Sequence, residues 1–155
     1  MREMRRKDRA LTDEAAWEIV ESSDFGTLSM LTEDNTPYCV PLNFVRKGDC
    51  LYFHCAKEGW KTELLRNNSA VCVSFVSKAA IDAAALTTKF ASATLFGTAE
   101  EVTEDSERSE ALTLIARRFA PDHKAAAEKE LKYLPVTALW RIKVTRITGK
   151  SNIQK

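Results

Sequence analysis

Six strand-like segments constrain the fold of this chain more than any other feature. The turn Lys47-Gly48-Asp49, between the second and third segments, is typical of a hairpin. The segments, rich in β-branched and aromatic residues or alternating in polarity, are Phe25–Leu31, Pro37–Arg46, Leu51–Cys55, Ala70–Ser77, Thr88–Val102 and Pro135–Thr148. Six strands joined mostly as meanders favour a closed antiparallel barrel with helices outside, because closure removes exposed sheet edges.

Helical patterns lie before, between and after these strands. Thr12 or Asp13 can cap a first helix. The apolar stripe of that helix is formed by Ala16, Trp17, Ile19 and Val20. Further helices are expected at 58–66, from Thr103 or Asp105 to Phe119, and at about 123–132.

Two places in the second half of the chain depart from a regular strand pattern. Residues 78–87 are rich in alanine, and we expect a loop that can include a helical turn. Gly97 lies inside the fifth strand-like segment, where it predicts a bulge or a close approach of another backbone.

Composition limits the class of protein. The 155 residues suffice for one domain with a real core, which we place at 1–155 with a basic arm at 1–10. Hydrophobic residues make up 45% and charged residues 29%, which argues against disorder. The net charge of +1 gives no global attraction for nucleic acid or an anionic membrane, so any anion site must be local.

Targeting signals and metal-site spacings are not found in the sequence. No apolar run approaches the roughly 20 residues that span a bilayer, and the charged start lacks a secretory signal core. We expect a cytoplasmic protein, with its cysteines as small buried apolar residues. The four cysteines, which show no paired Cys-x-x-Cys spacing, are Cys39, Cys50, Cys55 and Cys72. Only His54 and His123 could add imidazole ligands, at no ligand spacing, so no metal site is expected.

Residues 51–65, LYFHCAKEGWKTELL, join a strand, a loop with a glycine and two lysines, and the start of a helix. Such a turn can hold a phosphate, because free backbone N–H groups and the helix dipole face the anion. Lys57 and Lys61 could also be solvated charges at a helix start. The neighbouring strand and glycine lead us to favour an anion site.

Four sequence segments, in one order along nearly the whole chain, carry a family pattern. They are MRRKDR at 4–9, VPLNF at 40–44, LYFHCAKEGWK at 51–61 and ITGK at 147–150. Together they resemble the pyridoxamine 5′-phosphate oxidase-like proteins with an FMN-binding split barrel, and most closely the nitroimidazole-resistance branch. The resemblance implies a six-stranded antiparallel split β-barrel with flanking helices. It also implies a homodimer with FMN at the subunit interface.

The resemblance further implies which residues contact the flavin. Lys61 matches the phosphate-binding lysine of the family, and Gly59 matches a small residue that donates to the phosphate. Asn43 is expected as a buried amide whose hydrogen-bond partners flavin ring edges can supply. The expected cofactor-binding set is completed by Val40, Leu42, His54, Cys55, Lys57, Trp60, Ser92 and Thr94.

Two departures from the family pattern matter. Trp60 stands where the family usually has a second arginine or lysine, which removes a charge-assisted phosphate contact worth roughly 1.5–3 kcal/mol. Trp60 could instead cover the flavin or the dimer seam, or simply pack in the core or at a rim. Residues 79–88 lack the tryptophan-containing pattern expected before the long strand, which concerns the substrate face rather than the phosphate site.

The function that the resemblance implies is an FMN-dependent oxidoreductase, passing electrons from NAD(P)H to a small acceptor such as a nitroaromatic. The sequence offers no nucleophile–base constellation, so we assign no catalytic side chain and expect no hydrolase chemistry. Two alternatives stay open: a flavin-binding module without turnover, and a heme-binding split barrel with His54 or His123 as axial ligand. No nucleic-acid partner is expected, because the basic arm lacks interleaved aromatic residues.

Overall fold

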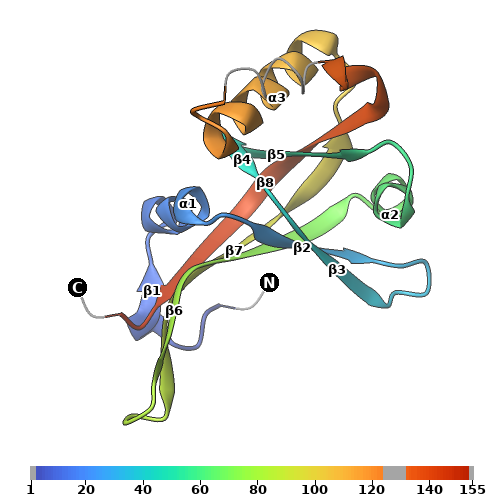
Figure 1. The fold of residues 1–155 in the computed structure, drawn as a ribbon. Coiled ribbons are helices and arrows are strands. Elements are labelled where there is room, and N and C mark those ends of the chain that lie inside the picture. The colour runs from blue at the N-terminus through green and yellow to red at the C-terminus, as the bar shows by residue number, and fades with distance from the viewer. Residues whose placement is uncertain (1–2, 124–131, 154–155) are drawn as a thin grey trace.

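An antiparallel sheet curled around an apolar core dominates this computed structural model, which describes residues 3–123 and 132–153 (Figure 1). Within those residues the strands are β1 (Ala10–Leu11), β2 (Gly26–Leu31), β3 (Pro37–Leu42), β4 (Val45–Lys47), β5 (Cys50–Ala56), β6 (Ala70–Asp82), β7 (Thr87–Glu101) and β8 (Thr137–Ser151). The helices are α1 (Asp13–Ser22), α2 (Trp60–Asn67) and α3 (Asp105–Phe119), with short 3-10 turns η1 (Lys7–Arg9) and η2 (Leu134–Val136).

The strand order in the sheet is β3-β2-β6-β7-β8-β5-β4, with β1 paired to the far end of β8. The six predicted strands correspond to β2, β3, β5, β6, β7 and β8, and the predicted split-barrel architecture is confirmed. The extra strands β1 and β4 are only two and three residues long. β4 exists because the predicted second segment does not continue straight: β3 ends at Leu42, and Val45 pairs with Tyr52 of β5.

The alanine-rich residues 78–87 form a hairpin, so the prediction of a loop with helical character was wrong. β6 and β7 stay paired out to Asp82 and Thr87, beyond a bulge between Val76 and Lys78. This hairpin protrudes from the rest of the molecule (Figure 1), and its residue Leu86 is 93% exposed. The helix preference of alanine is a weak local term, which the cross-strand ladder overrides here.

The predicted irregularity at Gly97 is confirmed. The register between β7 and β8 shifts between Phe96 and Gly97. A Cβ atom on Gly97 would lie 2.3 Å from the carbonyl oxygen of Lys143, so no side chain fits there without a shift of the backbone.

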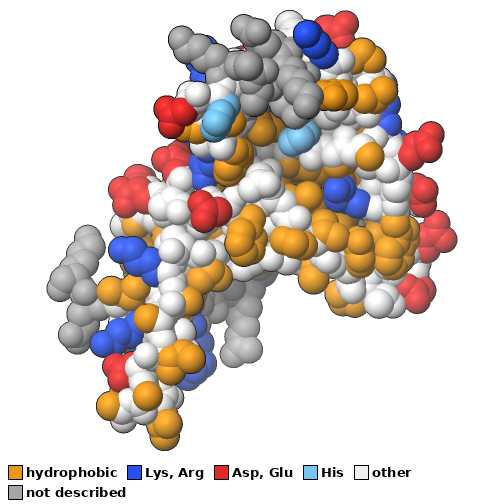
Figure 2. Space-filling view, viewed as in Figure 1, with side chains coloured by type: hydrophobic (Ala, Val, Ile, Leu, Met, Phe, Trp, Pro, Cys, Tyr) orange, Lys and Arg blue, Asp and Glu red, His pale blue; other side chains and the backbone are white. Residues whose placement is uncertain are grey.

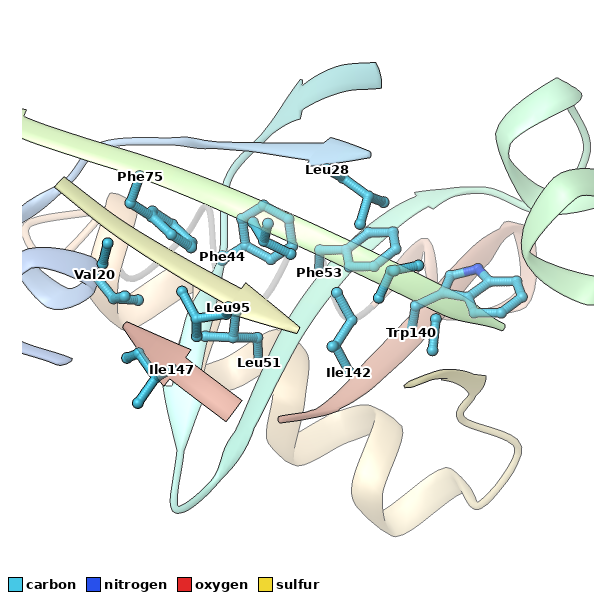
Figure 3. Close-up of a cluster of buried hydrophobic side chains, with 14 of the residues drawn as sticks. Val20, Leu28, Phe44, Leu51, Phe53, Phe75, Leu95, Trp140, Ile142 and Ile147 are labelled. Carbon is cyan, nitrogen blue, oxygen red and sulfur yellow. The ribbon is translucent and has the colours of Figure 1, made fainter. Parts of the chain in front are cut away.

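Aromatic side chains fill the centre of the barrel (Figure 3). The Phe44 ring meets the rings of Phe53 and Phe75 edge-on, with centroids 5.5 Å apart in both pairs. Phe53 in turn stacks on Trp140 at 6.5 Å and an interplanar angle of 7°. Each large apolar side chain buried in this way contributes roughly 1.5–3 kcal/mol to stability.

Helix α1 packs against one end of the barrel core. As predicted, Thr12 caps it, its Oγ1 accepting from the Ala15 N–H at 3.3 Å, and its apolar stripe is buried. At the other end of α1, the Arg118 guanidinium donates to the carbonyl oxygens of Val20, Glu21 and Ser23 at 3.1, 2.8 and 2.8 Å. That contact fixes the C-terminus of α1 to the end of α3.

Helix α3 covers the outer face of the sheet where β4, β5 and β8 meet. Its N-cap is Glu104, without a side-chain hydrogen bond, rather than the predicted Thr103 or Asp105. The helix predicted at about 123–132 falls mainly on 124–131, outside the described residues. None of the helices that the structure describes has the length and apolarity needed to cross a membrane.

Candidate functional site at the split of the barrel

The barrel is split between β3 and β5. β3 is one end of the strand order, and at the other end β4 covers only Cys50–Tyr52 of β5. Helix α2 follows β5 after a short turn and reaches across this opening. Its first residue, Trp60, places its ring 4.4 Å from the ring of Tyr38 on β3, at an angle of 43°. The two aromatic residues therefore connect the two sides of the split.

A hollow of about 240 Å³ lies at this split, between the two strand edges and the start of α2. Figure 2 shows hydrophobic side chains gathered where β3 and α2 lie in Figure 1. The hollow is lined by Tyr38, Val40, Cys55, Ala56, Glu58, Gly59, Trp60, Lys61 and Thr62. Five of the predicted cofactor-binding residues are thus brought together: Val40, Cys55, Gly59, Trp60 and Lys61.

Gly59 gives the turn its shape. Its φ of 135° and ψ of 162° belong to a region that residues with a side chain rarely adopt. A Cβ atom at this position would meet nothing within 4 Å, so the need for glycine is conformational. The Gly59 carbonyl accepts from Thr62 Oγ1 at 2.6 Å and from the Glu63 N–H at 3.2 Å, which starts the helix.

The start of α2 offers backbone donors to the hollow. The first intrahelical donor is the N–H of Glu63, so the N–H groups of residues 60–62 precede the helical ladder. Among the described residues no side chain caps this end of α2. The free donors and the positive end of the helix dipole make the turn suitable for an anion.

Lys61 is half-buried and lines the hollow. Its Nζ lies 6.0 Å from the centroid of the buried Phe53 ring, beside the Cys55 thiol. Burial raises the pKa of Cys55, and the charge and hydrogen bond of Lys61 lower it by a smaller amount. The thiol is therefore neutral at pH 7, and the lysine supplies a positive charge inside the site.

Two other cationic residues near the turn, Arg66 and Lys57, do not line the hollow. Arg66 donates to Glu101 Oε2 from Nε and Nη2 at 3.0 and 2.9 Å, and to the Lys57 carbonyl at 3.3 Å. It therefore ties α2 to β7 and to the loop. The side chain of Lys57, predicted at the cofactor, is exposed and does not line the hollow.

The predicted ring contacts on β3 do not all lie at the hollow. Leu42 is half-buried and packs against the barrel core. Asn43 follows the end of β3 and is exposed, and its Nδ2 donates to the Asp24 carbonyl at 2.7 Å. The expectation of a buried amide in search of partners was wrong, because the chain leaves the sheet one residue earlier.

The remaining predicted residues lie on other faces of the sheet. Cys55 packs toward the barrel core, whereas His54 is its neighbour on the strand and points to the opposite face, which it shares with Tyr52 beneath α3. Ser92 and Thr94 alternate with the buried Ala93 and with Leu95, so they lie on the outer face of β7. The structure therefore does not bring these three polar residues to the hollow within one chain.

The cysteines are less buried than the sequence suggested. Cys39 is exposed on the outer face of β3, and Cys50, Cys55 and Cys72 are half-buried. All four are free thiols. The prediction of buried cysteines was wrong: Cys39 and Cys72 lie on the outer face of the sheet, Cys50 lies at the edge of the cluster under α3, and Cys55 lies at the hollow.

Sequence reasoning missed Tyr38 and Thr62. Tyr38 lies two residues before Val40, so the alternation of a strand places both on the same face. Thr62 follows Gly59 by three residues, a spacing at which a hydroxyl commonly bonds back to a helix start. Both signals were present in the sequence.

Comparison with known proteins identifies the family. The sequence profile of the pyridoxamine 5′-phosphate oxidase family matches residues 12–151, nearly the whole chain. The chain belongs to this family. A comparison with curated proteins finds no match.

Solved structures share the fold of this pyridoxamine 5′-phosphate oxidase family member. A candidate 5-nitroimidazole antibiotic resistance protein from Bacteroides thetaiotaomicron is 25% identical, with a TM-score of 0.76 over 91% of this chain and 85% of that chain. A flavocytochrome from Azotobacter vinelandii is 19% identical, with a TM-score of 0.81 over 98% of this chain and 73% of that chain. An FAD-binding protein from Mesorhizobium loti is 20% identical, with a TM-score of 0.69 over 94% of this chain and 98% of that chain. The first of these agrees with the predicted likeness to the nitroimidazole-resistance branch.

Proposed function

We propose that this protein binds FMN and acts as a flavin-dependent oxidoreductase. The observation that carries the proposal is the turn at the split, where Gly59, the free N–H groups of residues 60–62 and the ammonium of Lys61 surround one hollow. Family membership supports it, as do two structural neighbours that are named as a flavocytochrome and as an FAD-binding protein.

The residues at the turn fit a flavin phosphate. They offer backbone donors, one lysine and a helix start, which is the donor set that phosphate groups prefer. The hollow, at about 240 Å³, is below the roughly 300–1,000 Å³ of typical ligand pockets. It would therefore hold the phosphate end, and the flavin ring would lie beyond it.

A second copy of this chain would complete the ring end of the site. The outer face of β3, β2, β6 and β7 carries uncharged side chains along its centre, and no described helix covers it as α3 covers β5. These side chains are Thr27, Ser29, Cys39, Pro41, Cys72, Ser74, Val76, Ser92, Thr94 and Phe96. Scarcity of charge is typical of the centre of a protein–protein interface. A homodimer through this face would bring Ser92 and Thr94 to the cofactor.

A bound flavin supplies the electron-transfer chemistry, and the protein supplies binding, orientation and shielding from water. Lys61 and the helix start neutralise the phosphate. The Tyr38–Trp60 contact closes the split beside the phosphate. We propose NAD(P)H as the electron donor and a small nitroaromatic as the acceptor, which the structural neighbour named for nitroimidazole resistance supports.

The absorbance spectrum of the purified protein, followed by titration with FMN, tests this function. We expect flavin absorbance or uptake of FMN, and then oxidation of NADH or NADPH when a nitroaromatic is added. A protein that shows no flavin absorbance and takes up no FMN would contradict the proposal. Bound FMN without turnover on a broad panel of acceptors would favour the binding-module alternative, and a Soret band would favour the heme-binding one.

A further inference from the structure

Trp60 has an exposed indole beside the proposed phosphate position. It is the first residue of α2, and 54% of it is exposed although Tyr38 packs against its ring. The contact with Tyr38 fixes the orientation of the indole and leaves much of its surface open at the rim of the hollow. A large aromatic surface held open beside a binding site is a platform for stacking.

The charges of the residues that line the hollow limit how much phosphate charge the site can balance. Of the described residues that line it, Lys61 is cationic and Glu58 is anionic, so the lining is balanced. Arg66 is engaged by Glu101. A phosphate monoester has a second pKa of about 6 and is close to doubly charged at pH 7. When the flavin phosphate is joined to a second phosphate, each of the two carries a single charge, and Lys61 and the helix start need to balance only the first of them.

We infer that the site extends past the flavin phosphate, and that an aromatic base linked through this phosphate, as adenine is in FAD, stacks on Trp60. The inference rests on the proposed flavin function and adds the group beyond the phosphate. FMN and FAD share the same ring, ribityl chain and first phosphate, so both can enter the site. FAD adds a second phosphate, a ribose and the adenine base, and the base would lie at Trp60.

The test compares the dissociation constants of FMN and FAD, measured by fluorescence titration, for the wild-type protein and for variants at Trp60. We expect the wild type to bind FAD at least as tightly as FMN. Trp60→Ala should weaken FAD binding about tenfold more than FMN binding, the usual size of a base–aromatic stacking contact. Trp60→Phe should keep most of the FAD affinity. Trp60→Arg adds a cation and should strengthen FMN binding.

Two controls separate this inference from other effects. Lys61→Ala should weaken both flavins and leave their ratio unchanged, because the lysine contacts the shared phosphate. Phe119→Ala, which removes another exposed aromatic residue at the end of α3, should change neither affinity.

Several results would overturn the inference. One is a wild-type protein that binds FMN more than about tenfold tighter than FAD, the size of the stacking contact. Another is equal weakening of both flavins by Trp60→Ala. A third is loss of dimer in light scattering of Trp60→Ala with an unchanged flavin ratio, which would assign the indole to the subunit interface. Binding of neither flavin would contradict the proposed function itself.

Discussion

Tyr38 of β3 and Trp60 of α2 hold their rings 4.4 Å apart across the split of the barrel. β3 and α2 reach this point from opposite sides of the opening, and no sheet hydrogen bond between β3 and β5 closes it in the described residues. The contact therefore holds the two sides of the opening together at a place where no strand pairing does so.

Removal of the Tyr38 ring should weaken the fold at this opening. We expect Tyr38→Ala to lower the free energy of unfolding by more than about 1 kcal/mol, because the aromatic pair contributes roughly 0.5–1.5 kcal/mol beyond its buried area and Tyr38 also packs against the barrel core. Denaturant unfolding measures the change. Tyr133→Ala, at an exposed tyrosine outside the split, is the matched control and should have a smaller effect. Equal losses in both variants would mean that the pair adds nothing specific.

Replacement of Lys61 should act on the cofactor and spare the fold. Lys61→Ala removes a charge-assisted contact worth roughly 1.5–3 kcal/mol, so FMN affinity should fall at least about tenfold. Lys57→Ala should reduce it less than about threefold, because that side chain is exposed and outside the hollow. FMN titration gives the affinities, and circular dichroism checks the fold. An unchanged affinity in Lys61→Ala would show that the phosphate lies elsewhere.

A side chain at Gly59 should strain the turn. The φ of 135° and ψ of 162° at Gly59 are reached almost only by glycine, and we expect Gly59→Ala to cost about 1–3 kcal/mol. Thermal unfolding and FMN titration should both report the change, because relief of the strain would move the N–H groups of α2. Gly48→Ala, at the φ of 60° of a hairpin turn, is the control that should lower stability without altering FMN affinity. Wild-type stability and affinity in Gly59→Ala would refute the argument.

Tyr52 should make the protein sensitive to alkali. Its hydroxyl donates to Glu107 Oε1 at 2.8 Å, and burial together with this carboxylate raises the pKa of Tyr52 to about 12. The unfolded chain releases this proton at about pH 10. Stability should therefore be complete below pH 10 and fall as the pH rises from about 10 to 12.

The variant Tyr52→Phe isolates this contribution. It removes the titrating group, so its unfolding free energy should decline less than that of the wild type over the same pH range. Chemical denaturation at a series of pH values measures both slopes. Parallel slopes would mean that Tyr52 keeps its ordinary pKa in the fold.

The sequence predicted those features that depend on neighbours along the chain. The six main strands follow from local alternation, and the turn at Gly59 follows from a glycine between a strand and a helix. It could not predict that Tyr38 meets Trp60, because that contact depends on how the sheet curls. The alternation of β5 does separate His54 from Cys55, and this signal is local. The alanines of 78–87 suggested helix, where pairing with a distant strand decides the conformation.

The position of β8 in the sheet has a consequence for how this protein is made. β8 pairs with β1, β5 and β7, and it is the strand that joins the first half of the sheet order to the β5–β4 pair. During synthesis, the edges of β5 and β7 that pair with β8 stay unpaired until residues 137–151 have left the ribosome. A chain interrupted before that point would present the open edges of β5 and β7 to other chains, and such edges favour pairing between molecules.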